Sequence, residues 1–170
     1  MNVQIQVPKH PASVSTLYRR KPTANGGLSV VHEGVKFTYL DHPEVVIHTT
    51  PDRGLHITSF EEFSASQEVS EKILHSDYHS GAVERANTLL LISPSYNLLL
   101  MNCQHLSSFI ATGEATCGEL QATICGMGLG WLIGSTSFKE QSLGIKVSLA
   151  IAGGVIAQGF YKTSRLKPAP

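Results

Sequence analysis

The feature that most constrains the fold of this chain is a pair of apolar segments in its C-terminal third. Residues 120–138 and 147–161 contain no charged residue, and the polar residues 139–142 lie between them. Small residues recur every four positions in both segments, at Gly126, Gly130, Gly134, Ala150 and Gly154. Because residues four apart share one face of a helix, this spacing predicts two helices that approach closely through small side chains.

The sequence alone does not decide whether this helical hairpin lies in a membrane or packs on protein. A helix needs about 20 apolar residues to cross the bilayer core, so the first segment is marginal and the second is short. One interpretation is membrane association through 119–161, and the other is packing on the domain or on another subunit. Lys162, Arg165 and Lys167 would suit a cytoplasmic tail that faces lipid. No apolar leader precedes Arg20, so we expect no cleavable signal peptide and a cytoplasmic or membrane-associated location.

The N-terminal third predicts an extended lead-in followed by strands. Prolines and the Asn25-Gly26-Gly27 turn favour extended chain and turns over residues 1–27. Short runs rich in β-branched and aromatic residues then predict an antiparallel meander, with a further edge strand at its end. The runs are 28–31, 35–40, 44–48 and 55–58, and turn-like breaks lie at Glu33-Gly34 and 41–43.

Helices are predicted after the strands. Ser59 followed by Glu62 forms a capping-box pattern, and the apolar spacing of 82–92 indicates a second helix. Asn102 is a good N-cap for a helix that ends at Gly113. The expected fold class is α+β, with a small antiparallel sheet and packed helices, plus the apolar glycine-rich helical C-terminal segment. The expected organisation is a lead-in (1–27), a domain (28–118) and a hairpin with a basic tail (119–170).

Composition excludes several classes of function. Lys and Arg number 13 and Asp and Glu number 13, so net charge gives no support for a nucleic-acid partner. Three cysteines, an odd number without paired spacing, suit neither a disulfide scaffold nor a zinc module. His75 and His79 lie four residues apart but have no evident third ligand, so we expect no metal and no cofactor.

Cys103 is the leading candidate for chemistry. It lies at the first turn of the helix capped by Asn102, where unpaired N–H groups and the positive end of the helix dipole favour the thiolate. The alternative is a small buried hydrophobe, which is common for free cysteine. Cys117 and Cys125 have no comparable setting and are interpreted as structural.

Two histidines are placed to serve that thiol. His32 and His48 end two predicted strands, and on neighbouring strands both imidazoles would reach one site, one as base and the other orienting it. The alternative is that some of the eight histidines fall at strand ends by chance. The remaining candidates for loop or surface positions are His42, His56, His75 and His79.

Weaker assignments surround the nucleophile. Tyr96 and Gln104 are candidates to donate to a tetrahedral oxyanion, although the backbone N–H of Cys103 is the safer choice. His105 lies on a different helix face from Cys103 and is interpreted, with Asn102, as a structural residue near the site.

Three segments together resemble the lecithin retinol acyltransferase family, a circularly permuted NlpC-type branch of papain-like thiol enzymes. They are His32–Val35, Val45–His48 and Asn102–His105, and Tyr96–Leu99 precedes the last in a compatible place. The resemblance covers about residues 28–117. It departs from the family's Asn-Cys-Glu-His-Phe motif at Gln104, which removes a charge near the site, and at Leu106, an apolar replacement for the aromatic residue.

The resemblance implies Cys103 as nucleophile, His32 as general base and His48 as the residue that orients the base. It implies acyl transfer or hydrolysis on lipid esters through a thioester, with a phospholipid or other acyl ester as substrate. The apolar tail is similar in position to the C-terminal anchors of some members. Two alternatives stay open: an NlpC-type cysteine peptidase or amidase, and a non-enzymatic protein that acts in membranes or particle assembly through its glycine-rich helices.

Overall fold

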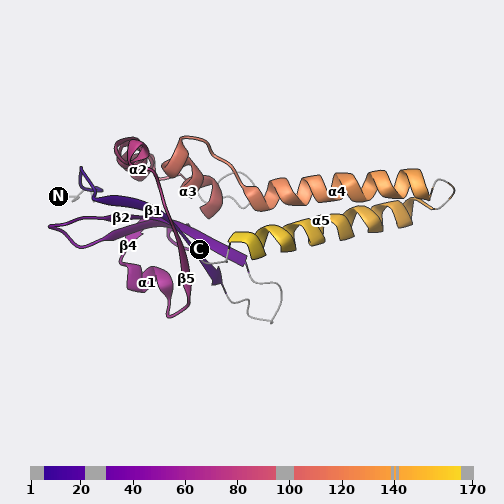
Figure 1. Ribbon diagram of the computed structural model, residues 1–170, viewed down its shortest axis with the longest axis horizontal. Helices are drawn as coiled ribbons and strands as arrows, with labels where there is room; N and C mark the ends of the chain where they lie inside the picture. The colour runs from indigo at the N-terminus through magenta and orange to yellow at the C-terminus, as the bar shows by residue number, and fades with distance from the viewer. Residues whose placement is uncertain (1–5, 22–29, 95–101, 139, 141, 166–170) are drawn as a thin grey trace. The chain divides into compact units, whose positions relative to one another are not determined.

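The computed structural model describes residues 6–21, 30–94, 102–138, 140 and 142–165. The chain divides into two compact units, Met1–Thr116 with Pro168–Pro170, and Cys117–Lys167. The first unit is α+β, and the second is a pair of helices (Figure 1).

A five-stranded antiparallel sheet forms the centre of the first unit. Its spatial order is β4-β3-β2-β1-β5. The strands are β1 (Ser13–Lys21), β2 (Val30–Thr38), β3 (Val45–Thr50), β4 (Gly54–Thr58) and β5 (Val69–Ile73). The prediction of an edge strand at residues 55–58 is confirmed, because β4 lies at one end of the sheet.

The expectation that residues 1–27 contain no packed element is wrong. Ser13–Lys21 forms β1, which pairs with β2 on one side and β5 on the other. Six consecutive residues of β1, 14–19, are buried, so the strand is covered on both faces. A strand covered on both faces carries no alternation of polar and apolar residues, and this signal was therefore missing from the sequence. The second edge strand, β5, is mostly exposed and polar and was missed as well.

The predicted break at Glu33-Gly34 is also wrong, because β2 runs without interruption through both residues. Gly34 is needed there because Phe63 approaches the strand closely, and not because the chain turns. A Cβ at this position would lie 2.8 Å from Cε2 of Phe63 and 3.2 Å from the carbonyl oxygen of Ile47. The glycine therefore lets an aromatic ring lie directly on the strand.

Helices cover both faces of the sheet (Figure 1). α1 (Phe60–Ser64) lies on one face, and α2 (His79–Ile92) and α3 (Cys103–Thr112) lie on the other, with a 3-10 turn at Ser76–Tyr78 before α2. The capping predictions are confirmed. Ser59 Oγ accepts from the backbone N–H of Glu62 at 3.1 Å, and Gly113 ends α3 with a φ of 86°.

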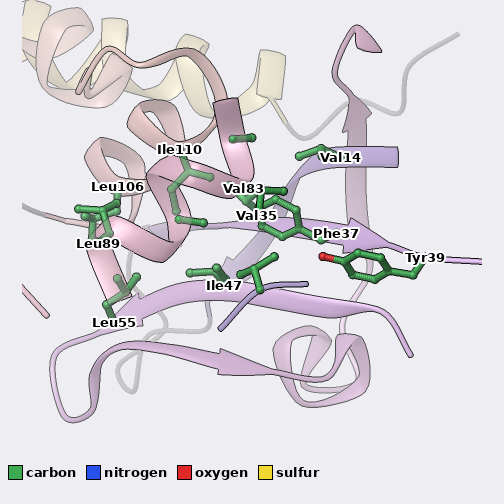
Figure 2. Packing of buried hydrophobic residues seen from close by; sticks show 13 residues of the cluster. Val14, Val35, Phe37, Tyr39, Ile47, Leu55, Val83, Leu89, Leu106 and Ile110 are labelled. Atoms are coloured by element: carbon green, nitrogen blue, oxygen red, sulfur yellow. The ribbon is translucent and has the colours of Figure 1, made fainter. Parts of the chain in front are cut away.

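The main hydrophobic core lies between the sheet and the pair α2 and α3 (Figure 2). Val35, Phe37 and Ile47 contribute from the strands, and Leu106 and Ile110 contribute from α3. A smaller cluster on the opposite face comprises Leu17, Val46 and Phe63. Successive residues of β3 join different clusters, since Val46 belongs to the smaller one and Ile47 to the main one.

The second unit is a hairpin of two helices, α4 (Gly118–Ser137) and α5 (Leu143–Arg165). Its glycine ridge packs as predicted. A Cβ at Gly126 would meet the carbonyl of Gly153, and a Cβ at Gly130 would meet the carbonyl of Leu149. The helices run antiparallel, since Glu119 at the start of α4 lies 3.9 Å from Lys162 near the end of α5.

Large apolar side chains cover the outer surface of this hairpin, among them Leu129, Leu132, Ile156 and Phe160. Residues Leu143–Ser164 of α5 are long and apolar enough to cross a membrane, judged by length and composition alone. Only 11% of the apolar 18-residue window within this segment is buried.

Candidate functional site

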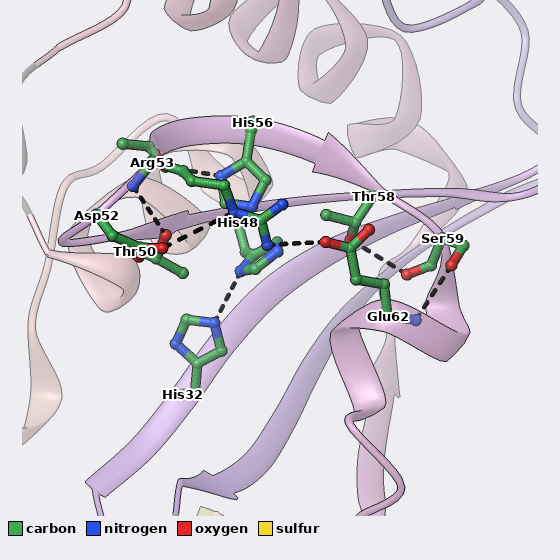
Figure 3. Close-up of polar contacts among 10 residues, drawn as sticks. His32, His48, Thr50, Asp52, Arg53, His56, Thr58, Ser59 and Glu62 are labelled. Atoms are coloured by element: carbon green, nitrogen blue, oxygen red, sulfur yellow. Dashed lines mark hydrogen bonds and ion pairs between the residues drawn. The ribbon is translucent and has the colours of Figure 1, made fainter.

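The first component of the candidate site is a pair of buried imidazoles. His32 Nε2 lies 2.8 Å from His48 Nδ1, a hydrogen bond between β2 and β3 (Figure 3). Both side chains are 5% exposed. Gly34 pairs with His48 in the strand register, so His32 lies two residues before that pair on the same face of β2. The structure therefore brings together the two histidines that the sequence singled out.

Neither histidine ends its strand, contrary to the prediction, because β2 continues to Thr38 and β3 continues to Thr50. Phe63 of α1 covers the pair instead. Its ring is stacked on His32 at 5.5 Å between centres and meets His48 edge-on at 5.3 Å. This contact depends on Gly34, over which the ring lies. The imidazoles are thus held between a strand surface and an aromatic lid.

Burial keeps both histidines neutral. It lowers the pKa of each well below the ordinary 6.5, and it is the largest cause in both cases. Nearby positive charge lowers them further, with Arg19 contributing to both. A neutral pair contains one donor and one acceptor across the 2.8 Å contact, so it requires no charge to be satisfied.

The geometry allows two tautomeric arrangements. In one, His48 Nδ1–H donates to His32 Nε2, which leaves His32 with a proton on Nδ1. In the other, His32 Nε2–H donates to His48 Nδ1, and the lone pair on His32 Nδ1 is free to accept a proton. Only the second arrangement makes His32 a base, with His48 as the residue that fixes its ring.

The second component is Cys103, the first residue of α3. Asn102 caps the helix, and its Oδ1 accepts from the backbone N–H groups of Gln104 at 2.9 Å and His105 at 3.1 Å. Cys103 is 9% exposed, and its sulfur lies 4.0 Å from the carbonyl oxygen of Val31. The predicted cap and helix start are confirmed, and they place the thiol beside the strand that carries His32.

α3 lies along β2, and this alignment sets the position of the thiol. Ser107, one turn after Cys103, donates from Oγ to Glu33 Oε2 at 2.8 Å. Four helical residues and two strand residues both span about 6 Å, so the contacts Cys103–Val31 and Ser107–Glu33 match in spacing. At the other end, Arg85 Nε donates to the carbonyl of Ile110 at 2.9 Å. Both ends of α3 are therefore anchored.

The thiol meets the sheet at the level of the backbone. Val35 and Phe37 belong to the core under α3, whereas His32 belongs to the opposite face, under Phe63. The Cys103 sulfur lies 4.0 Å from the backbone carbonyl oxygen of Val31, the residue that precedes His32. The sulfur is thus placed one residue before His32 along β2.

Arg19 is a residue of the site that sequence reasoning missed. It lies on β1 directly opposite His32, is 9% exposed, and its guanidinium carbon lies 5.4 Å from the ring centre of Phe63. Burial lowers the pKa of Arg19, and the charge of the Cys103 thiolate raises it. The charges of Arg19 and of the Cys103 thiolate therefore affect each other. The signal was present in Arg19-Arg20-Lys21, but the segment was interpreted as a lead-in.

His56 is the second residue that was missed, and its assignment to a loop or the surface is wrong. It lies on β4, and its ring centre is 4.3 Å from that of His48, on the side away from His32 (Figure 3). Its Nδ1 donates to the carbonyl of Gly54 at 2.8 Å. Among the described residues, neither His56 Nε2 nor His48 Nε2 has a hydrogen-bond partner. Pairing in register with His48 was the property that the sequence could not show.

The remaining predicted residues fall in several places. Tyr96 lies outside the described residues. Gln104 is buried, and His105 Nδ1 donates to Asn102 Oδ1 at 3.1 Å, which reinforces the helix cap. His42 and His75 are exposed, whereas His79 opens α2 and donates to the carbonyl of Leu74 at 3.2 Å. No group of three metal-ligating side chains occurs in the part of the chain that the structure describes.

Comparison of the sequence with protein-family models and with curated proteins finds no match to this chain.

Proposed function

We propose that this protein is a thiol acyltransferase or phospholipase-type hydrolase that acts on lipid esters. Cys103 is the nucleophile, His32 the general base, and His48 the residue that orients it. The observation that supports this most strongly is the buried 2.8 Å contact between His32 and His48, beside the strand residue that the Cys103 sulfur contacts. Two neutral imidazoles in contact are poorly explained as packing alone.

In the first half of the reaction, the Cys103 thiol gives its proton to His32 Nδ1. The thiolate then attacks the carbonyl carbon of an acyl ester, and the backbone N–H of Cys103 donates to the oxyanion. When the carbon–oxygen ester bond breaks, the leaving alkoxide takes the proton from His32. The products of this half are an alcohol and a thioester on Cys103.

In the second half, His32 takes a proton from water, an alcohol or an amine as this acceptor attacks the thioester. The carbon–sulfur bond breaks, and the thiolate recovers the proton from His32. Throughout, His48 Nδ1 accepts from His32 Nε2–H, and this bond keeps His32 in the tautomer whose lone pair is on Nδ1.

The fold we propose is the circularly permuted NlpC-type arrangement. Two strands carry the histidines and precede the helix that begins at the cysteine, which is the order in the family that the sequence resembles. We further propose that the hairpin of α4 and α5 holds the enzyme at a bilayer, where its substrate is found. The membrane-length segment of α5, mostly exposed within the hairpin, supports this part of the proposal.

The test is formation of an acyl-enzyme by the full chain. Incubation with phosphatidylcholine in detergent micelles should add one acyl mass to Cys103, and neutral hydroxylamine should remove it. Cys103→Ala should abolish the adduct, whereas Cys125→Ala should retain it, because Cys125 is an exposed residue of α4. Acylation that persists without Cys103 would contradict the proposal. Cleavage of a peptidoglycan stem peptide, with no reaction on lipid, would favour a peptidase.

A further inference from the structure

Arg19 is a charged side chain that the fold buries without giving it a counter-ion. It is 9% exposed, and its Nε is fully buried without a hydrogen-bond partner among the described residues. A guanidinium presents five N–H donors and accepts nothing. In the part of the chain that the structure describes, no carboxylate forms an ion pair with Arg19, although other arginines have partners.

Two glutamates of the same unit have other partners. Glu62 of α1 pairs with Arg53 at 2.7 Å. Glu33 belongs to the opposite face of β2, where it accepts from Ser107 at 2.8 Å. The guanidinium lies over the face of Phe63, which favours a cation but accepts no conventional hydrogen bond. The Nε–H of Arg19 is therefore a buried donor whose hydrogen-bonding capacity is unused among the described residues.

The register places this unused capacity at the candidate site. Arg19 is the direct partner of His32 in the antiparallel pair of β1 and β2, and the two side chains lie on one face. Burying a cation without acceptors is costly, so its presence at this position indicates an anion that arrives with a ligand. The planar fork of arginine suits bidentate contact with a phosphate or a carboxylate.

We propose that Arg19 binds the phosphodiester group of a glycerophospholipid and so presents the neighbouring acyl ester to Cys103. The inference rests on the proposed function and names its substrate class. In a glycerophospholipid the phosphate and the acyl esters are attached to one three-carbon glycerol unit. An anion bound next to His32 thus brings an ester carbonyl to the same site. The membrane-length α5 makes a bilayer lipid the favoured source of the phosphate.

The experiment compares two substrates that differ only in the phosphate-bearing group. Dihexanoylphosphatidylcholine and dihexanoylglycerol carry the same acyl esters, and release of hexanoate from each is measured with the full chain below the micelle concentration of the lipid. Arg19→Gln should lower kcat/KM for the phospholipid by roughly 10- to 100-fold, the range expected for a lost hydrogen bond to a charged group. The loss on the neutral ester should be at least about tenfold smaller, since that substrate reports only the effect of the Arg19 charge on His32 and Cys103 and lacks the phosphate contact.

Two further variants control the comparison. Arg19→Lys keeps the charge and loses the bidentate contact, so we expect an intermediate loss on the phospholipid alone. Arg20→Gln is the matched control, because Arg20 is the next residue of β1, is exposed and points to the other face. Equal losses on both substrates in Arg19→Gln would overturn the proposal, and so would unchanged rates on both.

A binding measurement separates this inference from the proposed function. In the Cys103→Ser chain, which cannot form a thioester, the Arg19 Nε–H resonance should shift on titration with monomeric dihexanoylphosphatidylcholine. Dihexanoylglycerol should leave it unchanged. A shift in this variant, together with no turnover by the wild-type chain, would retain the lipid site and refute the enzyme. Turnover by the wild-type chain without a shift in the variant would retain the enzyme and refute the lipid site at Arg19. A shift with inorganic phosphate alone would show that the site accepts phosphate without the lipid.

Discussion

The two units of this protein bury opposite kinds of group at their closest contacts. In the sheet unit, the closest packing surrounds polar side chains: Phe63 lies on Gly34 and covers His32 and His48. In the hairpin, close packing brings backbone to backbone across Gly126, Gly130 and Gly153, and many large apolar side chains are exposed. Glycine permits close approach in both units. One glycine makes room for an aromatic lid over a polar site, and the others make room for a second helix.

The difference shows how the same residue serves a site in one place and an assembly in another. A polar pair under a ring needs complete hydrogen bonding, and its strength depends on protonation. Helix backbones in contact need only small side chains and are insensitive to protonation. All eight histidines of the chain lie in the first unit and none lies in the hairpin. The comparison can be tested by changes that affect one unit and spare the other.

The largest expected effect is on activity, in the sheet unit alone. Replacing His32 with Gln removes the general base, so turnover of a phospholipid ester should fall by about 10²- to 10⁴-fold. His48→Gln should produce a smaller loss, because an amide can still accept from His32 Nε2. His42→Gln, at an exposed position, is the control. If His32→Gln retained wild-type turnover, the histidine pair would have no catalytic role.

The next effect is a loss of stability in acid that is confined to the sheet unit. His32 and His48 are neutral in the fold because burial lowers the pKa of each below 6.5, whereas the unfolded chain titrates near that value. Unfolding therefore takes up protons below pH 6.5, and the free energy of unfolding falls as pH falls. Between pH 7.5 and 5.5 the two residues together should cost about 3 kcal/mol.

Urea unfolding followed by amide exchange in the two units measures this loss. His75→Gln is the control, since His75 is exposed beside Asp77 and contributes no buried contact. Equal losses of stability in the sheet and the hairpin over this pH range would contradict the assignment to the histidine pair.

A smaller effect is expected from adding a methyl group beneath the ring of Phe63. Gly34→Ala places a methyl group against Phe63 and the backbone of Ile47, which should lower the free energy of unfolding by about 1–3 kcal/mol. A second substitution, Phe63→Leu, shortens the ring side chain, so the double variant should lose less than the sum of the single losses. Strict additivity in a thermal-unfolding cycle would show that the two residues do not contact each other.

The smallest effect concerns the hairpin. Gly130→Ala forces a Cβ against the carbonyl of Leu149, whereas Gly128→Ala meets nothing within 4 Å. We expect Gly130→Ala to separate the helices at a cost of about 1 kcal/mol or more, and Gly128→Ala to stabilise α4 by about 0.5–1 kcal/mol. Circular dichroism on heating distinguishes them. Similar behaviour of the two variants would refute close packing through the glycine ridge.

Several elements were predictable because their signals are local. Ser59 and Asn102 satisfy N–H groups within three residues of themselves, and Gly113 supplies the left-handed conformation that ends α3. The four-residue spacing of small residues likewise specified the facing surfaces of α4 and α5. In each case the interacting groups are neighbours in sequence or repeat with the helical period, so the pattern can be read without knowledge of the fold.

Other features were predicted wrongly or were missed. β1 was interpreted as a lead-in because both of its faces are covered, and Glu33-Gly34 was interpreted as a turn because the need for glycine came from Phe63, 29 residues away. Arg19 and His56 were overlooked for the same reason. Their importance comes from strand register, which pairs Arg19 with His32 and His56 with His48.

The sequence by itself determined where helices begin and end, which helical surfaces are small enough to touch, and which thiol lies at a helix N-terminus. These follow from hydrogen bonds and periodicity within a few residues. Only the tertiary structure decided that His32 and His48 are in contact, that Phe63 covers them, and that Arg19 lies beside them with no ion pair among the described residues. Those contacts depend on strand pairing and on which face each side chain takes, and a shift of one residue in register would undo all of them.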